Sequence, residues 1–258
     1  MVSSDRARLA ANRPIFLTAD PLSLGAKCVL DERASRHLRV LRLDVGSYVG
    51  LRDGQGGTGA GRIVRITKAQ AVVDVDETGA VDQPPALHLL VPVADRDRML
   101  WLAEKACEFS LTSWRPVLWR RSRSVMPRGE GLTFQAKVRT RMEGALEQSH
   151  GAWMPQLYPE ATLERALMAA PRGDRLVLDP SGEPMINGKG GLAGPVVIAL
   201  GPEGGIEDDE RESLRAAGFE PVRLGDTILR FETAGIAALA IARNSITSTT
   251  RLASGFNG

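Results

Sequence analysis

Apolar and polar positions follow two different periodic patterns along the chain. In the first third, short apolar runs alternate with turn signals such as Asp53–Gly54 and Gly56–Gly57. This spacing of short strands and turns is typical of a small β-barrel. We expect a helix over Glu32–Leu43 and strands at Pro14–Thr18, Lys27–Leu30, Ser47–Arg52, Gly61–Thr67 and Ala71–Asp76.

The segment Thr78–Ala86 interrupts this rhythm, and Pro84–Pro85 stiffens it. Glycine and proline at this density interrupt helices and strands alike. We therefore interpret the segment as a linker. It divides the chain into two expected domains, residues 1–82 and residues 83–258.

Beyond the linker, strands alternate with helices, which predicts an α/β domain with a mainly parallel sheet covered on both faces. The expected strands are Leu87–Val93, Arg115–Trp119, Arg175–Leu178, Val196–Leu200 and Pro221–Leu224. The expected helices are Arg98–Phe109, Gly131–Gln148, Leu163–Ala169, Asp208–Ala217 and Thr233–Ile246. Asp208 and Asp209 are expected to cap the fourth helix, and Gly218 is expected to end it.

Two apolar runs of this domain end in glycine turns, VVIALGPEGG (Val196–Gly205) and LGDTILRFETA (Leu224–Ala234). The carboxyl ends of parallel strands are where α/β folds bind ligands. A phosphate cradle needs Lys with Ser or Thr after its glycines, whereas the first turn carries Glu203. An acidic residue there suits ribose hydroxyls, an amine or a sulfonium, and this is the first indication of S-adenosylmethionine.

Composition indicates an ordinary globular protein of one large or two modest domains, with 258 residues, 43% hydrophobic and 25% charged. It has only two cysteines, Cys28 and Cys107. A disulfide framework is therefore not expected, and a reducing cytoplasm suits the chain better. The first thirty residues lack the apolar core of a signal peptide, and we expect no membrane-spanning segment.

The net charge of +2 is unevenly distributed. Residues 1–82 carry 12 basic and 10 acidic side chains, residues 83–141 carry 11 and 5, and residues 142–258 carry 10 and 16. The stretch Arg115–Arg141 holds eight basic side chains and the single acidic residue Glu130. Such a stretch either follows a nucleic-acid backbone or forms a solvated cationic surface.

Several chemistries have no support in the pattern. No G-x-G-x-x-G follows the early strands, and the three histidines show no metal-ligand spacing, so no metal is expected. Cys107 lies in an expected helix, where a buried structural thiol is a better interpretation than a nucleophile. Methylating a pyrimidine carbon generally needs a cysteine adduct. Methylating a nitrogen or a ribose oxygen needs only positioning and removal of a proton.

Five blocks then occur in one order: HLRVLRL (His37–Leu43), EKACEF (Glu104–Phe109), EQS with a following MP (Glu147–Pro155), ALGPEGGIEDDE (Ala199–Glu210) and LGDTILRFETA. Together they resemble the ribosomal small-subunit methyltransferase E family of the SPOUT superfamily. The resemblance runs from Pro14 to about Ala242, and the ordered set is far more specific than GPEGG alone.

This resemblance implies a PUA-like N-terminal barrel that binds RNA and a C-terminal SPOUT domain with a deep trefoil knot. It implies S-adenosylmethionine as the methyl donor and a homodimer that shares its active site across the interface. The family methylates N3 of one uridine in 16S rRNA, so the expected partner is the 30S ribosomal subunit.

The resemblance also assigns residues. Arg230 would stabilise charge on a uracil carbonyl oxygen, and Glu232 would orient that arginine. The cofactor would be bound by Leu178, Leu200, Gly201, Pro202, Glu203, Gly204, Gly205, Leu224, Gly225, Ile228, Leu229 and Thr233. RNA phosphates would be bound by Arg13, Arg36, Arg39, Arg42, Arg120, Arg121 and Arg123.

The chain departs from the family pattern in two places. Where an arginine usually follows EQS, this chain reads HGA (His150–Ala152), so His150 or a basic side chain of Arg115–Arg141 would have to replace it. Where the family usually reads ELG, this chain reads EFS (Glu108–Ser110), a change of backbone freedom rather than of charge.

Two other functions remain open at this level. A SPOUT ribose 2′-O-methyltransferase acting on rRNA or tRNA would share the same cofactor loops. A non-catalytic RNA-binding module would use the basic barrel alone. A phosphate-cleaving nucleotide enzyme is a distant third, because the chain has neither a P-loop nor suitably spaced metal carboxylates.

Overall fold

The computed structural model describes residues 13–124, 128–185, 192 and 194–254, and for residues 123, 124 and 247–254 it describes the backbone alone. The chain forms two compact units. Unit 1 comprises Met1–Gln83 and Glu143–Met154, and unit 2 comprises Pro84–Met142 and Pro155–Gly258. The break at Gln83 lies next to the expected boundary, while the segment Glu143–Met154 groups with unit 1 rather than with its sequence neighbours.

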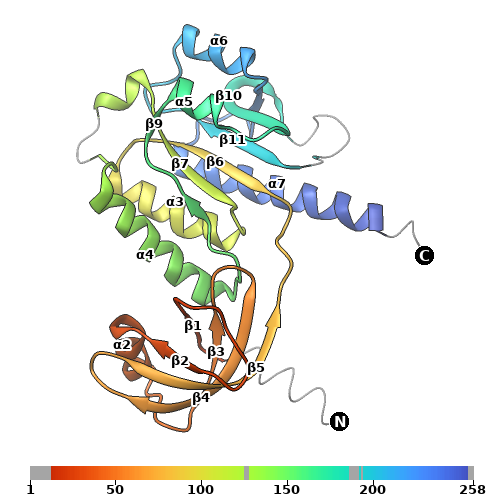
Figure 1. Cartoon of the computed structure of the whole chain (residues 1–258). Coiled ribbons are helices and arrows are strands. Elements are labelled where there is room, and N and C mark those ends of the chain that lie inside the picture. Colours follow the sequence, from red (N-terminus) through yellow and green to blue (C-terminus); the bar gives the residue numbers. More distant parts are fainter. Residues whose placement is uncertain (1–12, 125–127, 186–191, 193, 255–258) are drawn as a thin grey trace. The chain divides into compact units, whose positions relative to one another are not determined.

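The helices and strands keep the expected order (Figure 1). The strands of unit 1 are β1 (Ile15–Leu17), β2 (Lys27–Leu30), β3 (Tyr48–Arg52), β4 (Gly57–Ile66) and β5 (Ala71–Ala80), with helix α2 (Glu32–Val40). The strands of unit 2 are β6 (Leu87–Pro92), β7 (Ser113–Leu118), β8 (Gln156–Leu157), β9 (Ala161–Thr162), β10 (Asp174–Pro184), β11 (Val196–Leu200) and β12 (Glu220–Arg223). The remaining helices are α3 (Arg96–Glu108), the 3-10 helix η1 (Arg120–Ser124), α4 (Leu132–Ser149), α5 (Leu163–Met168), α6 (Asp208–Ala216) and α7 (Phe231–Ser254).

Unit 1 is built on a five-stranded sheet in the order β1-β3-β4-β5-β2. The β1–β3 pair is parallel and the other pairs are antiparallel. Alternate strand residues point to one side, where α2 packs its apolar face on them. The buried core includes Phe16, Leu30, Leu38, Val49, Leu51 and Ile63.

The expected linker begins later than the sequence indicated. Thr78–Ala80 continue β5 and pair with Gly57–Gly59 of β4, which begins four residues before the expected start of its strand. A Cβ at Gly61 would lie 1.9 Å from the Asp74 carbonyl oxygen, so the two backbones approach at a bulge that only glycine allows. Ladder hydrogen bonds thus extend this hairpin through residues of low strand propensity.

The helix of unit 1 ends at Val40 rather than at Leu43. Arg42 has φ +57, and this left-handed conformation cannot continue a helix. The amide of Leu43 then donates to the Leu38 carbonyl at 2.9 Å, which closes the helix end.

Glu147, in the EQS block, links the end of α4 to other segments of unit 1 by hydrogen bonds. Its carboxylate is buried and accepts from the Leu17 amide at 3.1 Å and from Arg33 Nη2 at 2.8 Å. Burial raises the pKa of Glu147, and these two donors oppose that shift. Both contacts satisfy a carboxylate that would otherwise be costly to bury.

Unit 2 is a parallel sheet in the order β12-β10-β11-β6-β7-β8, with β9 pairing to β7. The two-residue strands β8 and β9 were not predicted, because they are too short to show any periodicity. All five residues of β11 are buried, as expected for a strand covered on both faces.

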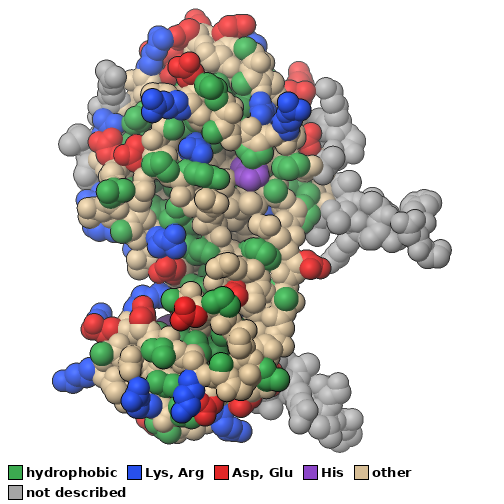
Figure 2. All heavy atoms as spheres, viewed as in Figure 1, with side chains coloured by type: hydrophobic (Ala, Val, Ile, Leu, Met, Phe, Trp, Pro, Cys, Tyr) green, Lys and Arg blue, Asp and Glu red, His purple; other side chains and the backbone are tan. Residues whose placement is uncertain are grey.

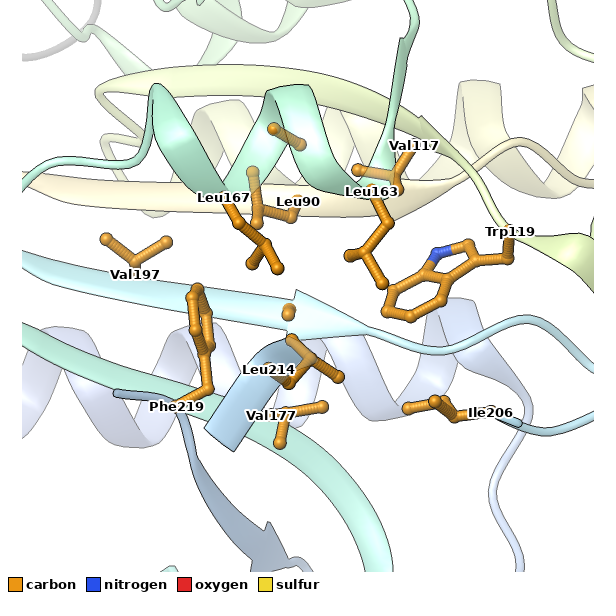
Figure 3. Packing of buried hydrophobic residues seen from close by; sticks show 12 residues of the cluster. Leu90, Val117, Trp119, Leu163, Leu167, Val177, Val197, Ile206, Leu214 and Phe219 are labelled. Atoms are coloured by element: carbon orange, nitrogen blue, oxygen red, sulfur yellow. The ribbon is translucent and has the colours of Figure 1, made fainter. Parts of the chain in front are cut away.

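Side chains alternate between the two faces of this sheet. On one face, Val197 and Ala199 join α5 and α6 in a core that also contains Leu90, Val117, Trp119, Leu163, Leu167, Val177, Ile206, Leu214 and Phe219 (Figure 3). On the other face, Leu200 contacts α7 and α3, where a Cβ at Gly235 would lie 2.9 Å from both Leu200 and Leu102. The α/β architecture expected from the sequence is confirmed. No helix of the described residues is long and apolar enough to cross a bilayer.

Helix α6 begins at Asp208, as expected, but its N-cap is the preceding residue. Glu207 is the N-cap, and it forms a capping box with Glu210, whose carboxylate accepts from the Glu207 amide at 3.0 Å. Asp208 and Asp209 fill the first turn, where negative charge complements the helix dipole. Gly218 follows the helix with φ +80, as predicted.

Arg243 of α7 joins three segments of unit 2. It is half-buried and donates to the carbonyls of Pro85 at 2.7 Å, Ser110 at 2.8 Å and Phe109 at 3.0 Å. Ser110 has φ +54, a left-handed conformation that favours glycine. The departure from ELG to EFS therefore places a side chain where the backbone requires a left-handed turn.

Replacing Ser110 with Gly should increase the free energy of unfolding by about 0.5 kcal/mol, because relief of the left-handed conformation exceeds the added chain entropy. The matched control is Ser213→Gly in α6, which should decrease it by a similar amount. Urea unfolding measures both changes, and a loss of stability in S110G would contradict this interpretation.

Candidate cofactor site

Three parallel strands of unit 2 end side by side. Leu178 of β10 is in register with Leu200 of β11 and with Val222 of β12. Their carboxyl ends therefore open on the same edge of the sheet, where α/β folds bind ligands. The two glycine turns singled out in the sequence follow β11 and β12 directly.

A cavity of about 1000 Å³ lies at this edge. This is the upper range of small-molecule sites in proteins. It is lined by Leu178–Pro180, Leu200–Ile206 and Val222–Phe231, together with Arg98, Arg211 and Ala234. The sheet edge thus forms one half-open site, mainly from three separate segments of the chain.

The first loop, Gly201–Gly205, requires glycine for steric reasons. A Cβ at Gly201 would lie 2.7 Å from Ile206 Cγ1, and a Cβ at Gly204 would lie 2.9 Å from Arg121 Cβ. Gly205 has φ +80, and its amide donates to the Pro202 carbonyl at 2.9 Å. The loop is a tight turn whose backbone borders the cavity.

The second loop, Leu224–Arg230, presents apolar side chains at the rim. Ile228 is 89% exposed and Leu229 is 38% exposed, and both line the cavity. Gly225 lines the cavity, and a Cβ added to it would meet no atom within 4 Å, so the space beside this residue is open. The loop leaves room that a flat apolar ligand group can fill.

Every predicted cofactor residue except Thr233 lines this cavity. Thr233 lies in the first turn of α7 and is exposed. Arg230 also lines the cavity, immediately before α7, and its carbonyl accepts from the Ala234 amide at 2.8 Å. Two loops that are far apart in sequence are thus brought together around one space.

Comparison with known proteins is consistent with this geometry. The sequence pattern of the RNA methyltransferase domain matches residues 82–243, and that of the RNA methyltransferase PUA domain matches residues 30–76. The chain belongs to the RNA methyltransferase domain family. The resemblance predicted from the ordered blocks is confirmed.

Three relatives illustrate the likeness. A ribosomal RNA small subunit methyltransferase E from Synechocystis sp. is 29% identical over 78% of this chain and 67% of its own. The crystal structure of a ribosomal RNA small subunit methyltransferase E from Neisseria gonorrhoeae, bound to S-adenosyl methionine, is 27% identical, covers 90% of this chain and 98% of its own, and has a TM-score of 0.81. A methyltransferase structure from Legionella pneumophila with bound cofactor shares the fold at 24% identity, with the same coverage and TM-score.

In this RNA methyltransferase domain, Glu232 is turned toward Arg98 rather than toward Arg230. Glu232 is buried, and its Oε1 lies 3.8 Å from Arg98 Nε. Among the described residues, no ion pair joins Arg230 to Glu232, and Glu232 Oε2 has no hydrogen-bond partner. Glu232 is therefore placed beside Arg98, and not where it would orient Arg230 as expected.

Arg98 is a site residue that sequence reasoning missed. It forms an ion pair with Glu203 of the first glycine loop, as well as approaching Glu232. It lies in the first turn of α3, which Asp95 caps directly after β6. Because β6 is a neighbour of β11 in the parallel sheet, its carboxyl end reaches the same edge. The start of the helix that follows β6 was therefore a place where a site residue such as Arg98 could have been expected.

Asp179 shapes the third wall of the cavity. It is buried and accepts from the amide of Ser181 at 2.9 Å and from its hydroxyl at 2.7 Å, and it pairs with Arg211. Leu178 and Glu183 both face Val222, so the residues between them form a bulge. The bulge directs the chain around the cavity edge.

Of the predicted RNA-binding arginines of unit 1, Arg42 is exposed, and the other three are exposed or half-buried and contact near neighbours. Arg13 lies over the Tyr48 ring at 4.5 Å, Arg36 pairs with Glu32 at 3.0 Å, and Arg39 donates to the Ser35 carbonyl at 3.3 Å. On the face that Figure 2 shows, Lys and Arg side chains are interspersed with Asp and Glu side chains. The basic groups are therefore partly neutralised by near neighbours.

The predicted RNA-binding arginines of unit 2 lie beside the first glycine loop. Arg120 pairs with Glu207 at 3.2 Å and with Asp209, and Arg121 donates to the Gly204 carbonyl at 2.8 Å. The side chain of Arg123 lies outside the described residues. His150, the possible substitute for the missing arginine, is exposed with φ +61.

Cys107 is a buried structural thiol, as predicted. Its sulfur donates to the Met142 carbonyl at 3.3 Å, and burial raises its pKa to about 12. Cys28 is half-buried with a pKa raised to about 11, mainly by burial. Neither thiol supplies a thiolate at neutral pH.

Replacing Arg98 with Met should decrease the free energy of unfolding by about 2 kcal/mol, because the buried Glu232 carboxylate then loses its cation. The same substitution at Arg36, whose pair with Glu32 is exposed, should change it by less than about 0.5 kcal/mol. Urea unfolding of both variants measures the difference. Equal effects at the two positions would show that Arg98 does not compensate Glu232.

Proposed function

We propose that this protein transfers the methyl group of S-adenosylmethionine to N3 of one uridine in 16S rRNA. The observation that carries the proposal is the cavity lined by the two glycine loops, where Glu203 stands in place of the lysine of a phosphate cradle. Membership of the RNA methyltransferase family and the likeness to a relative bound to S-adenosyl methionine support it.

The residues of the cavity fit this cofactor. Leu178, Leu224, Ile228 and Leu229 offer apolar surface for an adenine ring, and Gly225 leaves its Cβ position open. Gly201, Gly204 and Gly205 line the cavity with backbone alone, because glycine has no side chain. When bound, the cofactor supplies an electrophilic methyl group on a sulfonium.

Arg230 is the group best placed to act on the substrate base. Uracil N3 is a poor nucleophile while protonated, so the site must favour loss of that proton and hold the resulting anion. Arg230 is exposed within the cavity and precedes α7, whose N-terminus adds positive partial charge. A fixed guanidinium here stabilises negative charge on a uracil carbonyl oxygen.

The proposal also covers the RNA substrate, the oligomeric state and the trefoil knot. The substrate is the 16S rRNA of the 30S subunit in the cytoplasm, and the target base is unstacked to reach the cavity. The enzyme acts as a homodimer, with the barrel arginines of unit 1 on the RNA. The deep trefoil knot implied by the family resemblance remains a prediction of the same proposal.

Gly225→Val should weaken S-adenosylmethionine binding at least tenfold, because the new side chain fills open cavity space while meeting no protein atom. Isothermal titration calorimetry measures the dissociation constant. The control is Gly144→Val in α4, where a Cβ also meets nothing within 4 Å but no cavity is lined. Unchanged affinity in G225V would place the cofactor elsewhere.

Methyl transfer is tested with labelled S-adenosylmethionine and 30S subunits that lack the modification, followed by nucleoside analysis and mapping of the label. We expect 3-methyluridine at one position in 16S rRNA. Arg230→Ala should reduce transfer by at least 10²-fold with little change in cofactor affinity. A labelled ribose 2′-oxygen would favour the ribose methyltransferase, and RNA binding without cofactor binding would favour a non-catalytic module.

A further inference from the structure

The first glycine loop has few contacts of its own. Gly204 and Glu203 are exposed. Among the described backbone hydrogen bonds, one lies within the loop, from the Gly205 amide to the Pro202 carbonyl. A loop of this composition has many accessible conformations. Something outside it has to hold the conformation that borders the cavity.

Arg121 of η1 supplies such a contact. Its Nη1 donates to the Gly204 carbonyl at 2.8 Å, and its aliphatic stem lies so close to Gly204 that a Cβ there would be 2.9 Å from Arg121 Cβ and 3.3 Å from Cδ. The glycine is therefore needed because the arginine lies flat against it. Stem and guanidinium hold the same residue of the loop.

The guanidinium is itself held in place from α6. Arg121 Nε donates to Glu207 Oε1 at 3.3 Å, and Glu207 is the N-cap of that helix. The capping-box partner Glu210 is buried and accepts from the Arg120 amide at 2.9 Å. Consequently η1, the start of α6 and the glycine loop form one hydrogen-bonded unit.

We propose that Arg121 is a positioning residue for the cofactor site, which acts by holding the Gly204 carbonyl and thereby the Gly201–Gly205 loop. This inference rests on the proposed function, and it differs from the expectation that Arg121 binds RNA. The side chain of the neighbouring Arg120 pairs with Glu207 and Asp209, and within the described part of the chain no hydrogen bond joins it to the loop.

This difference provides a charge-matched pair of variants. Arg121→Gln and Arg120→Gln each remove one positive charge from the same 3-10 helix, so any general loss of RNA attraction is the same in both. Only R121Q removes the bond to Gly204. We expect R121Q to raise the dissociation constant for S-adenosylmethionine about tenfold, which corresponds to about 1.4 kcal/mol, and R120Q to change it by less than twofold.

The readouts are calorimetric binding of S-adenosylmethionine and, in the methyl-transfer assay, KM for the cofactor against kcat. R121Q should raise KM for S-adenosylmethionine and leave kcat nearly unchanged, because the reacting groups are untouched. Arg121→Lys keeps the charge but replaces the two nitrogens that bond Glu207 and Gly204 with a single nitrogen, so its affinity should lie between wild type and R121Q.

The outcomes separate the two proposals. Absence of cofactor binding by the wild-type protein would refute the proposed function. Normal binding by the wild type together with equal constants for R121Q and R120Q would overturn the positioning role alone. If R121Q does not fold, R121K gives the same comparison, and wild-type affinity in R121K would likewise overturn it.

Discussion

The parallel pairing of β11 with β10 on one side and β6 on the other is the constraint on which the site depends. Burial of both faces of Val196–Leu200 fixes which side chains face α5 and α6 and which face α3 and α7, since a shift of one residue would exchange them. With that register set, three chain segments must end at one edge of the sheet. The cavity is a consequence of strand register and of the short turns that follow it.

Charge compensation is the second organising feature of this edge. The first glycine loop and the start of α6 carry Glu203, Glu207 and Asp209, and arginines from α3 and η1 meet all of them. The acidic loop therefore does not present an uncompensated negative charge to a ligand. Glu203 still takes the place of the lysine in a phosphate cradle, but its negative charge is compensated by Arg98 instead of being free for a cationic ligand.

The contacts also distinguish the three arginines near the site by the groups to which they bond. Arg230 is exposed within the cavity, whereas Arg98 is occupied by two carboxylates and Arg121 by a carbonyl and a carboxylate. All three are arginines near the glycine loops, and the amino-acid composition does not distinguish them. Their different partners separate an exposed guanidinium that lines the cavity from guanidinium groups that bond to neighbouring segments.

The sequence by itself determined the order of most strands and helices, the α/β class of the second unit and the two glycine loops that line the cavity, but not Arg98 or Arg211. The elements and the glycine turns depend on local periodicity and on glycines directly after apolar runs, so they can be recognised within a window of a few residues. The individual cofactor residues were assigned by the family resemblance of the ordered blocks. It did not show the extension of β5 through Thr78–Ala80, the short strands β8 and β9, or the grouping of Glu143–Met154 with unit 1. Nor did it show that Glu232 faces Arg98 instead of Arg230. Each of these depends on a partner more than a dozen residues away in sequence, and only the folded chain decides which distant groups meet.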